Sequence, residues 1–455
     1  MSRRRSRLAR WSALLLAYLV VPLAALATLE VCLRLGGALR PTTFFVAAPD
    51  RPGSEDAVAT NPLFGYTWFP ASYAIRPAPR RVARAPGDET LRVAVVGGSA
   101  AFGDLAPRFG LSRVLEVVLA GATDRPVEVV NAALAGVNSH VVRRIVDDVL
   151  DLRPDAVVIY LGHNEVVGPW GPGAVAERGD PDDRPPPLAT IRRVEALRTL
   201  RLAQALGRLS PRVGAPDAAS ARPAADEIAA LEVPLGDPRL ERVEAHLEAN
   251  LRAMVRAVRR AGAIALVVAP ASNLRDFAPF ASTVPDGAAG EAVRRGLEAM
   301  FDAAEAGDCD RLFALADELG AAGAETADAV WLRGRCLLRD GELEAARDAL
   351  RRARDLDAQR YRADSRLRAA ILEIADDEGA RVLDGAELLA DADGLAGADS
   401  FYDHVHLTFE GNRRLAVGIA QRLASEAAAA SGFEAERLDP ERLDPSPADL
   451  QRALA

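Results

Sequence analysis

Short apolar runs alternate with amphipathic stretches over most of the chain beyond Leu91. Five of these runs are continuous rather than alternating, a pattern typical of strands that are covered on both faces. Amphipathic stretches with helical spacing lie between them. This alternation predicts an α/β fold: a three-layer α/β/α sandwich with a five-stranded parallel, flavodoxin-like sheet. The predicted strands lie at 92–98, 127–134, 154–162, 262–270 and 379–385, and the clearest helices at 112–120, 141–152 and 238–261.

An apolar segment near the N-terminus predicts a membrane helix. Five arginines in the first ten residues precede eighteen uncharged residues, from Ser12 to Leu29, which is about the shortest length that spans a bilayer. The positive-inside rule keeps the arginines in the cytoplasm. Residues 1–36 are therefore expected to be a cytoplasmic tail and a single-pass anchor, with the rest of the chain in the periplasm or at the cell surface. A cleaved signal peptide is the alternative, because residues 25–27 resemble a cleavage site.

The rest of the chain divides by composition. A lead-in segment or linker, rich in Pro, Arg and aromatic residues, is expected at 37–90. The α/β domain is expected at 91–285 and 359–430. Within its first part, residues 170–234 are rich in proline and glycine and are expected to form a lid-like insertion. A polar tail is expected at 431–455.

A second insertion, at 286–358, is predicted to be helical. Its small residues, such as Gly334, Ala346 and Ala353, recur at a spacing that resembles a tetratricopeptide unit, in which two antiparallel helices nest. One or two such units do not form a free-standing solenoid. We therefore expect the insertion to dock on the α/β domain and to be a possible site for a protein partner.

Composition and charge narrow the classes of function. Hydrophobic residues make up 49% of the chain and charged residues 27%, as in a folded globular protein. The net charge of −9 argues against a nucleic-acid partner. The three cysteines are too few for a disulfide framework. Cys309 and Cys336 either pair in an oxidising compartment or are two small buried side chains.

The first predicted strand ends in Gly97-Gly98-Ser99, a turn that fits either a phosphate-binding loop or a serine nucleophile. A dinucleotide loop needs a further glycine where Ser99 stands, and a Walker loop needs a lysine. The chain contains no lysine. A nucleophile needs a base, an acid that orients the base, and donors for an oxyanion.

Residues with those properties follow the other predicted strands. Asp403 and His406 are three residues apart, so the carboxylate can reach the imidazole and fix its tautomer, leaving the other ring nitrogen to accept the serine proton. A backbone N–H at Gly136 and a side-chain amide at Asn164 could join the Ser99 amide as three oxyanion donors. In a doubly wound sheet all of these segments can lie at the carboxyl edge, where ligands bind.

The same segments resemble the SGNH (GDSL-type) hydrolase superfamily. The four matching blocks read "VVGGSAAFG", "NAALAGVNS", "LGHNE" and "DHVH", and the resemblance spans roughly 91–423. It implies that Ser99 is the nucleophile and that Ser99, Gly136 and Asn164 form the oxyanion hole. It further implies that His406 is the base and Asp403 its orienting acid.

Two positions depart from the family pattern. Gly98 stands where many members have aspartate, and Glu165 stands where the third block often has aspartate. With its N-terminal anchor and helical insertion, the chain is similar to a membrane-anchored bacterial subgroup of this superfamily.

Three further residues are expected near the site. Asn273 and Arg275 follow the fourth predicted strand and could contact substrate, and His404 could line the pocket. A zinc site made by Asp403, His404 and His406 is an alternative, because His-x-His can bind zinc. We favour no metal, since the cysteines are remote and the chain has no HExxH motif. No cofactor is expected.

These features predict a serine-dependent ester hydrolase that works outside the cytoplasmic membrane through an acyl-serine intermediate. Its substrate would be an ester or an O-acylated glycan. A sugar hydroxyl as acceptor, in place of water, would make the protein an O-acyltransferase or O-acetyltransferase of cell-surface glycans, and the motifs do not separate the two. A catalytically degenerate SGNH domain that acts as a binding module is the non-enzymatic alternative.

Overall fold

A computed structural model of the chain describes residues 14–49, 56–69, 74–87, 89–103, 109–174, 184–209, 232–424, 442 and 445–454. The chain divides into two compact units. The first comprises Met1–Thr42, Leu63–Ala74 and Pro186–Arg222, and the second Thr43–Pro62, Ile75–Pro185 and Pro223–Ala455.

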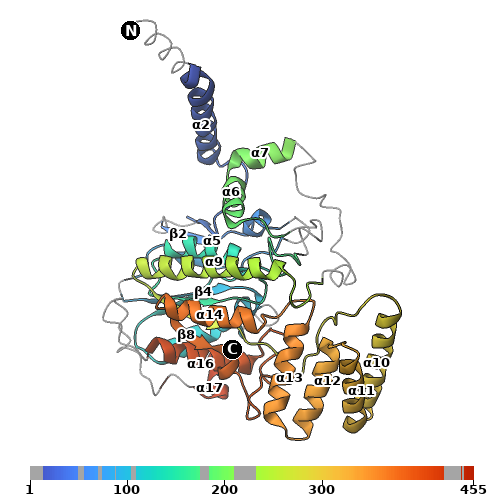
Figure 1. Cartoon of the computed structure of the whole chain (residues 1–455). Helices are drawn as coiled ribbons and strands as arrows, with labels where there is room; N and C mark the ends of the chain where they lie inside the picture. The colour runs from blue at the N-terminus through green and yellow to red at the C-terminus, as the bar shows by residue number, and fades with distance from the viewer. Residues whose placement is uncertain are drawn as a thin grey trace. The chain divides into compact units, whose positions relative to one another are not determined.

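The first unit contains the predicted N-terminal helix (Figure 1). A π-helical turn, η1 (Leu16–Val20), continues into α2 (Val21–Leu35). Among the described residues this is the one helix long and apolar enough to cross a membrane, with a mean hydropathy of 2.1. Almost all of its side chains are exposed. These properties suit a membrane span, and a signal sequence shares them.

Two consecutive helices belong to the first unit. α6 (Leu188–Arg198) is followed by its C-cap residue, Thr199, and α7 (Arg201–Leu209) starts two residues after that cap. The Glu30 carboxylate accepts the backbone N–H groups of Arg201 and Leu202, both at 2.9 Å. A side chain more than 170 residues away in sequence therefore caps α7 and favours the break. Both helices belong to the predicted lid, of which residues 175–183 and 210–231 lie outside the described part.

The second unit is built on a parallel sheet of five strands in the order β5-β4-β6-β7-β8, which confirms the predicted fold class. Each predicted apolar run overlaps one strand. The strands are β4 (Leu91–Gly97), β5 (Val127–Asn131), β6 (Ala156–Tyr160), β7 (Ile264–Ala269) and β8 (Arg381–Asp384). β5 and β6, which follow β4 in sequence, lie on opposite sides of it, so the strand order reverses at β4. A ligand site is expected at the carboxyl end of such a reversal.

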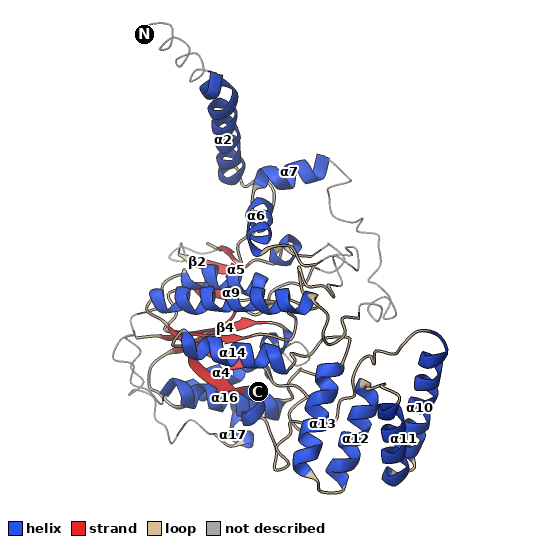
Figure 2. Ribbon diagram, viewed as in Figure 1, coloured by secondary structure: helices blue, strands red, loops and turns tan. Residues whose placement is uncertain are grey.

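Helices cover both faces of this sheet, as Figure 2 shows. On one face lie α4 (Leu111–Gly121) and α16 (Phe409–Ala424), which pack on each other and on Leu91, Val93 and Val95 of β4. On the other face, α9 (Arg239–Arg260) packs between α5 (Ser139–Leu150) and α14 (Ser365–Asp377).

The C-terminal segment differs from the expected polar tail. Residues Pro447–Leu454 form a helix, α17, which packs against α4. Leu450 is 1% exposed and joins the core cluster together with Leu454. The two leucines are four residues apart, so they share one face of the helix, and their burial explains why this stretch is ordered.

A small antiparallel sheet, β1-β2-β3, occupies part of the expected linker. Its strands are β1 (Phe45–Ala47), β2 (Ala57–Thr60) and β3 (Arg81–Ala83). Buried Phe44 and Val58 give this segment its own apolar contacts. The backbone N–H of Phe44 also donates to the Asp148 carboxylate of α5 at 2.6 Å, which ties the small sheet to the α/β core.

The second insertion consists of four helices that lie side by side (Figure 1). They are α10 (Gly287–Glu305), α11 (Cys309–Ala321), α12 (Ala327–Arg339) and α13 (Leu343–Leu356). A Cβ on Gly334 would lie 2.9 Å from the Leu350 side chain, so glycine permits the close approach of α12 to α13. Cys309 and Cys336 are both buried and form a disulfide that links α11 to α12, with a Cα–Cα distance of 5.7 Å.

Candidate functional site

The turn that carries Ser99 follows β4, the strand between β5 and β6. Ser99 is the first residue of a short helix, α3 (Ser99–Phe102), and Gly98 is its N-cap in an extended conformation. A Cβ on Gly97 would overlap the carbonyl oxygen of Tyr160 in the neighbouring β6. Glycine at this position therefore lets the turn leave the sheet edge while staying against β6, and Ser99 is displayed at the carboxyl edge.

The two other predicted oxyanion donors lie on loops that meet this turn. A Cβ on Gly98 would lie 2.9 Å from Asn164 Nδ2 and 3.4 Å from the Val137 carbonyl oxygen. Asn164 Nδ2 donates to that same carbonyl at 3.1 Å, and its amide has a second N–H available for another acceptor. Gly136 has a φ of +72°, the left-handed region that favours glycine. The structure thus brings the Gly98–Ser99 turn, the 136–137 loop and Asn164 together.

A buried polar network holds the Asn164 loop from behind. Glu165 is 3% exposed, and its carboxylate accepts the Ser139 backbone N–H at 2.9 Å and the Ser139 hydroxyl at 2.7 Å. Asn250 of α9 donates to the same hydroxyl at 3.0 Å. Burial raises the pKa of Glu165 to about 7, although the two bonds from Ser139 act to lower it. This network joins the loop after β6 to α5 and α9.

Asp403 and His406 lie on a loop that is closed by a bridge between Phe401 and Leu407. One Asp403 oxygen accepts the backbone N–H groups of Val405 and His406 at 2.9 and 2.8 Å. The other oxygen lies 2.6 Å from His406 Nδ1. The spacing of the two residues therefore has the consequence that the sequence predicts.

The charge on Asp403 decides the tautomer of His406. Burial acts to raise the pKa of Asp403, but hydrogen bonds from the His406 ring and from the backbone of His406 and Val405 lower it below its usual range. An ionised carboxylate only accepts, so His406 Nδ1 is the donor, and the lone pair of the neutral ring is on Nε2. His406 Nε2 is buried and makes no hydrogen bond within the part of the chain that the structure describes.

The loop after β6 contacts both halves of the site. Asn164 lies against the Gly98 turn, and the preceding residue, His163, faces His404 and His406. Burial lowers the pKa of His163 to about 3, and the nearby His404 and His406 rings act in the same direction, so His163 is neutral at pH 7. Ser99 and His406 share no hydrogen bond in this structure. Such bonds often tighten only when substrate is bound.

Arg275 is held in a network of ion pairs. Its guanidinium pairs with four carboxylates, at 3.0 to 3.2 Å, and these occupy its donors. Arg275 therefore ties the segment after β7 to the segment before the His406 loop, and we assign it no contact with substrate. The four partners are Asp276, Asp391, Asp393 and Asp399.

Asn273 is buried and supports the same region. Its backbone N–H donates to the His404 carbonyl at 3.0 Å, and its side-chain oxygen accepts the Asp276 N–H at 2.9 Å. Asn273 thus braces the loop that carries His404 and His406. It would act on a substrate through that loop.

His404 packs beside the catalytic candidates. Its ring centroid is 5.8 Å from that of His406, and its Nδ1 is 3.5 Å from Asp403. Burial lowers the pKa of His404 to about 4, so the ring is neutral at pH 7. Within the described ranges, no group of three or more His, Cys, Asp or Glu side chains is arranged to hold a metal ion.

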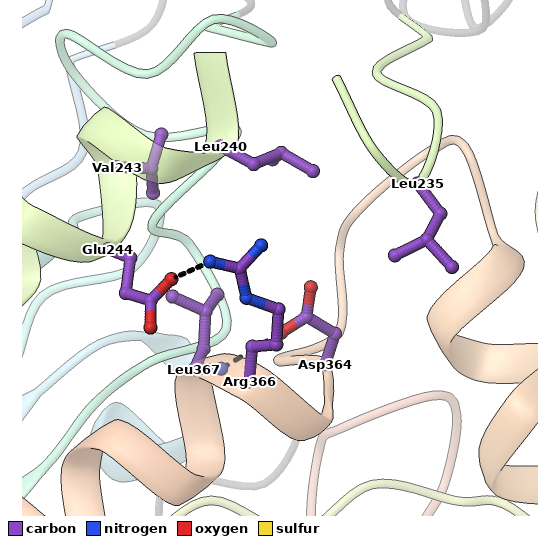
Figure 3. Close-up of a pocket in the computed structure, with 7 residues that line it drawn as sticks. All are labelled: Leu235, Leu240, Val243, Glu244, Asp364, Arg366 and Leu367. Carbon is purple, nitrogen blue, oxygen red and sulfur yellow. Dashed lines mark hydrogen bonds and ion pairs between the residues drawn. The ribbon is translucent and has the colours of Figure 1, made fainter. Parts of the chain in front are cut away.

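A pocket elsewhere in the second unit contains none of these residues (Figure 3). It lies where α9 and α14 approach the 232–238 segment, and the Arg366 guanidinium pairs with the Glu244 carboxylate at its wall. We assign it no role in catalysis. The lining residues are Leu235, Leu240, Val243, Glu244, Asp364, Arg366 and Leu367.

No protein-family model and no curated protein matches the chain. Among solved structures it is similar to a GDSL-like lipase from Bacteroides thetaiotaomicron, with 13% identity over 75% of this chain and 90% of that one, and a TM-score of 0.32. A lipase/acylhydrolase from Enterococcus faecalis also has 13% identity, over 77% and 97% of the chains, with a TM-score of 0.32. The acetylxylan esterase Axe2 from Geobacillus stearothermophilus has 12% identity over 73% and 93%, with a TM-score of 0.33. Similarity this distant says nothing about activity, which has to be argued from the site itself.

Proposed function

We propose that the chain is a serine-dependent ester hydrolase that works through an acyl-serine intermediate. The observation that carries the proposal is the pair made by Asp403 and His406. An ionised carboxylate bound to Nδ1 leaves the buried Nε2 as a proton acceptor. His163, on the loop after β6, faces this acceptor, and the next residue, Asn164, lies against the turn that displays Ser99.

In the first half-reaction the Ser99 hydroxyl oxygen attacks the carbonyl carbon of the ester while its proton passes to His406 Nε2. The negative charge that develops on the carbonyl oxygen is stabilised by the N–H groups of Ser99, Gly136 and Asn164. The bond to the alcohol then breaks, and the alcohol leaves with the proton from His406. The acyl group remains on Ser99.

In the second half-reaction a water molecule gives a proton to His406 Nε2 and attacks the acyl carbon. The tetrahedral intermediate collapses, the carboxylic acid leaves, and the proton returns to the Ser99 oxygen. Asp403 stays ionised throughout and stabilises the imidazolium that forms in each half-reaction.

We place this reaction outside the cytoplasmic membrane. The apolar helix of residues 16–35 follows an arginine-rich start, which favours a cytoplasmic N-terminus. The disulfide between Cys309 and Cys336 supports the same location, because disulfides persist in oxidising compartments and are rare in the cytosol. Protease digestion of intact spheroplasts tests this: the catalytic unit should be cut, whereas a cytoplasmic unit would be protected.

Hydrolysis of p-nitrophenyl acetate by the purified full chain tests the activity. We expect the wild type to hydrolyse the ester. Ser99→Ala and His406→Ala should each lower the rate of hydrolysis by roughly 10³-fold or more, whereas Ser112→Ala should keep the rate of the wild type. Ser112 is a matched control: it is a buried serine of α4 whose hydroxyl makes no hydrogen bond with a described residue. Transfer of acetyl to an added sugar in preference to water would favour a transferase. No turnover, with no labelling of Ser99 by a fluorophosphonate, would favour a binding module.

A further inference from the structure

Two segments connect the helical insertion to the α/β core, and both carry aromatic side chains to the neighbourhood of His406. Phe277 and Phe280 precede α10, and Tyr361 follows α13. The Phe280 ring centroid is 5.2 Å from that of Phe277 and 5.0 Å from that of Tyr361. All three rings contact His404, with centroids at 5.5, 5.0 and 6.1 Å. We call Phe277, Phe280, Tyr361 and His404 the aromatic platform.

The platform is held in place by the base of the insertion. The Asp357 carboxylate accepts the backbone N–H groups of Phe280 and Ala281 at 3.0 and 3.1 Å. The Ala358 N–H donates to the Ala281 carbonyl at 3.0 Å. Arg362, which is buried like Asp357, pairs with that carboxylate at 2.9 Å. The two connecting segments are therefore fastened to each other at the backbone of Phe280 and Ala281.

Part of this platform remains open to solvent. Phe280 is 38% exposed although it touches three other rings, and Phe277 and Tyr361 are only half-buried. A partly exposed aromatic cluster beside a candidate catalytic group is a feature of ligand sites. The faces of aromatic rings pack on flat apolar surfaces, and they orient the group that they bind.

The position of the platform indicates which half of an ester it meets. The oxyanion donors Gly136 and Asn164 hold the acyl carbonyl, whereas His406 gives its proton to the leaving alcohol in the proposed mechanism. His404 packs on His406, at 5.8 Å between centroids. A group that extends past His406 toward the platform is therefore the alcohol and not the acyl chain.

We infer that the aromatic platform binds a sugar ring, so that the alcohol half of the substrate is an O-acylated carbohydrate. This inference rests on the proposed ester hydrolysis and adds its substrate class. A sugar ring has apolar C–H faces that can lie on Phe280, and hydroxyl groups at its edge. The Tyr361 hydroxyl and the neutral His404 ring offer hydrogen-bonding atoms to that edge. A fatty alcohol would leave such polar groups unused.

Two acetyl esters that differ only in the alcohol test the inference. We expect Phe280→Ala to lower kcat/KM for 6-O-acetylglucose by about tenfold, the effect of one lost aromatic contact of about 1.4 kcal/mol. The same variant should lower kcat/KM for ethyl acetate by a much smaller factor, because the ethyl group does not extend to the platform. Phe301→Ala is the matched control: Phe301 is 41% exposed but lies on α10, so both esters should react as with the wild type.

Two kinetic results would overturn the inference. An equal loss on both acetyl esters would mean that Phe280 acts on the whole site rather than on the sugar. If Phe280→Ala lowers kcat/KM for ethyl butyrate more than for ethyl acetate, the platform binds the acyl chain and not the alcohol.

A readout without catalysis separates this inference from the proposed function. Saturation-transfer NMR should detect methyl glucoside on the wild-type chain and on Ser99→Ala, with the signal lost in Phe280→Ala. If no ester is hydrolysed but this pattern is observed, the proposed hydrolysis fails and the sugar site stands. If methyl glucoside gives no signal, or gives the same signal in Phe280→Ala, the sugar site fails.

Discussion

Replacing Glu165 with glutamine tests how the oxyanion loop is held. Glu165 is buried next to Asn164, and both of its oxygens bond Ser139. Glutamine keeps the length of the side chain, an oxygen for the Ser139 N–H and an N–H₂ for the Ser139 hydroxyl. The substitution therefore removes a titrating proton while preserving the network.

The size of the change in the free energy of unfolding follows from the pKa of Glu165 in the unfolded chain and in the folded chain. Burial raises the pKa of Glu165 from 4.5 to about 7 in the folded chain. Between these values the unfolded chain has lost the proton and the folded chain retains it, so the free energy of unfolding falls as the pH rises. At about 1.4 kcal/mol per pH unit the total loss is about 3 kcal/mol. This stabilisation is fully present below about pH 4.5 and is lost as the pH rises through about 7.

Urea unfolding of the full chain in a mild non-ionic detergent, at several values from pH 4 to 8, measures this effect. The free energy of unfolding of the wild type should fall relative to that of Glu165→Gln by about 3 kcal/mol across this range. Glu373→Gln, which changes an exposed carboxylate on α14, is the control and should follow the wild type. A difference between wild type and Glu165→Gln that stays constant with pH would refute the reasoning.

Three further predictions concern the site and the insertion. Asp403→Asn should lower kcat by roughly 10⁴-fold with little change in KM, because an amide no longer fixes the His406 tautomer. A loss of less than tenfold in kcat, measured by steady-state kinetics, would contradict this. Asn164→Ala should lower kcat by about 10²- to 10³-fold through the loss of one oxyanion donor, and a change confined to KM would contradict that role. Replacing both Cys309 and Cys336 with serine should destabilise the insertion by about 3 kcal/mol, as expected for a loop of this length, and an unchanged thermal midpoint would argue against the bond.

The inner strands β4, β6 and β7 could be predicted because each is rich in apolar residues and buried along its whole length. The edge strands β5 and β8 are only partly buried, and each still carries a short apolar core that marks its position. The small sheet could not be predicted, since β1, β2 and β3 have only three or four residues each and no room for a period. The break between α6 and α7 depends on Glu30, which is remote in sequence. Local pattern carries no information about such a partner.

The site shows the same division between local and distant information. Asp403 and His406 are bonded as their spacing predicts, because the contact is local. The ion pairs of Arg275 could not be predicted, because three of its four partners come from more than 100 residues away. The sequence pattern also does not predict that Glu165 supports the Asn164 loop through Ser139. The feature that could have indicated this support is a carboxylate that directly follows a predicted oxyanion donor.

Intact-mass spectrometry of the purified chain after brief exposure to p-nitrophenyl acetate tests the central claim most directly. The account predicts one added acetyl group, located by peptide mapping on Ser99, together with its absence in Ser99→Ala. Replacement of His406 by alanine should slow the appearance of that adduct by orders of magnitude. Turnover of the ester with the acetyl group on another residue, or an adduct on Ser99 that forms equally fast without His406, would contradict the account.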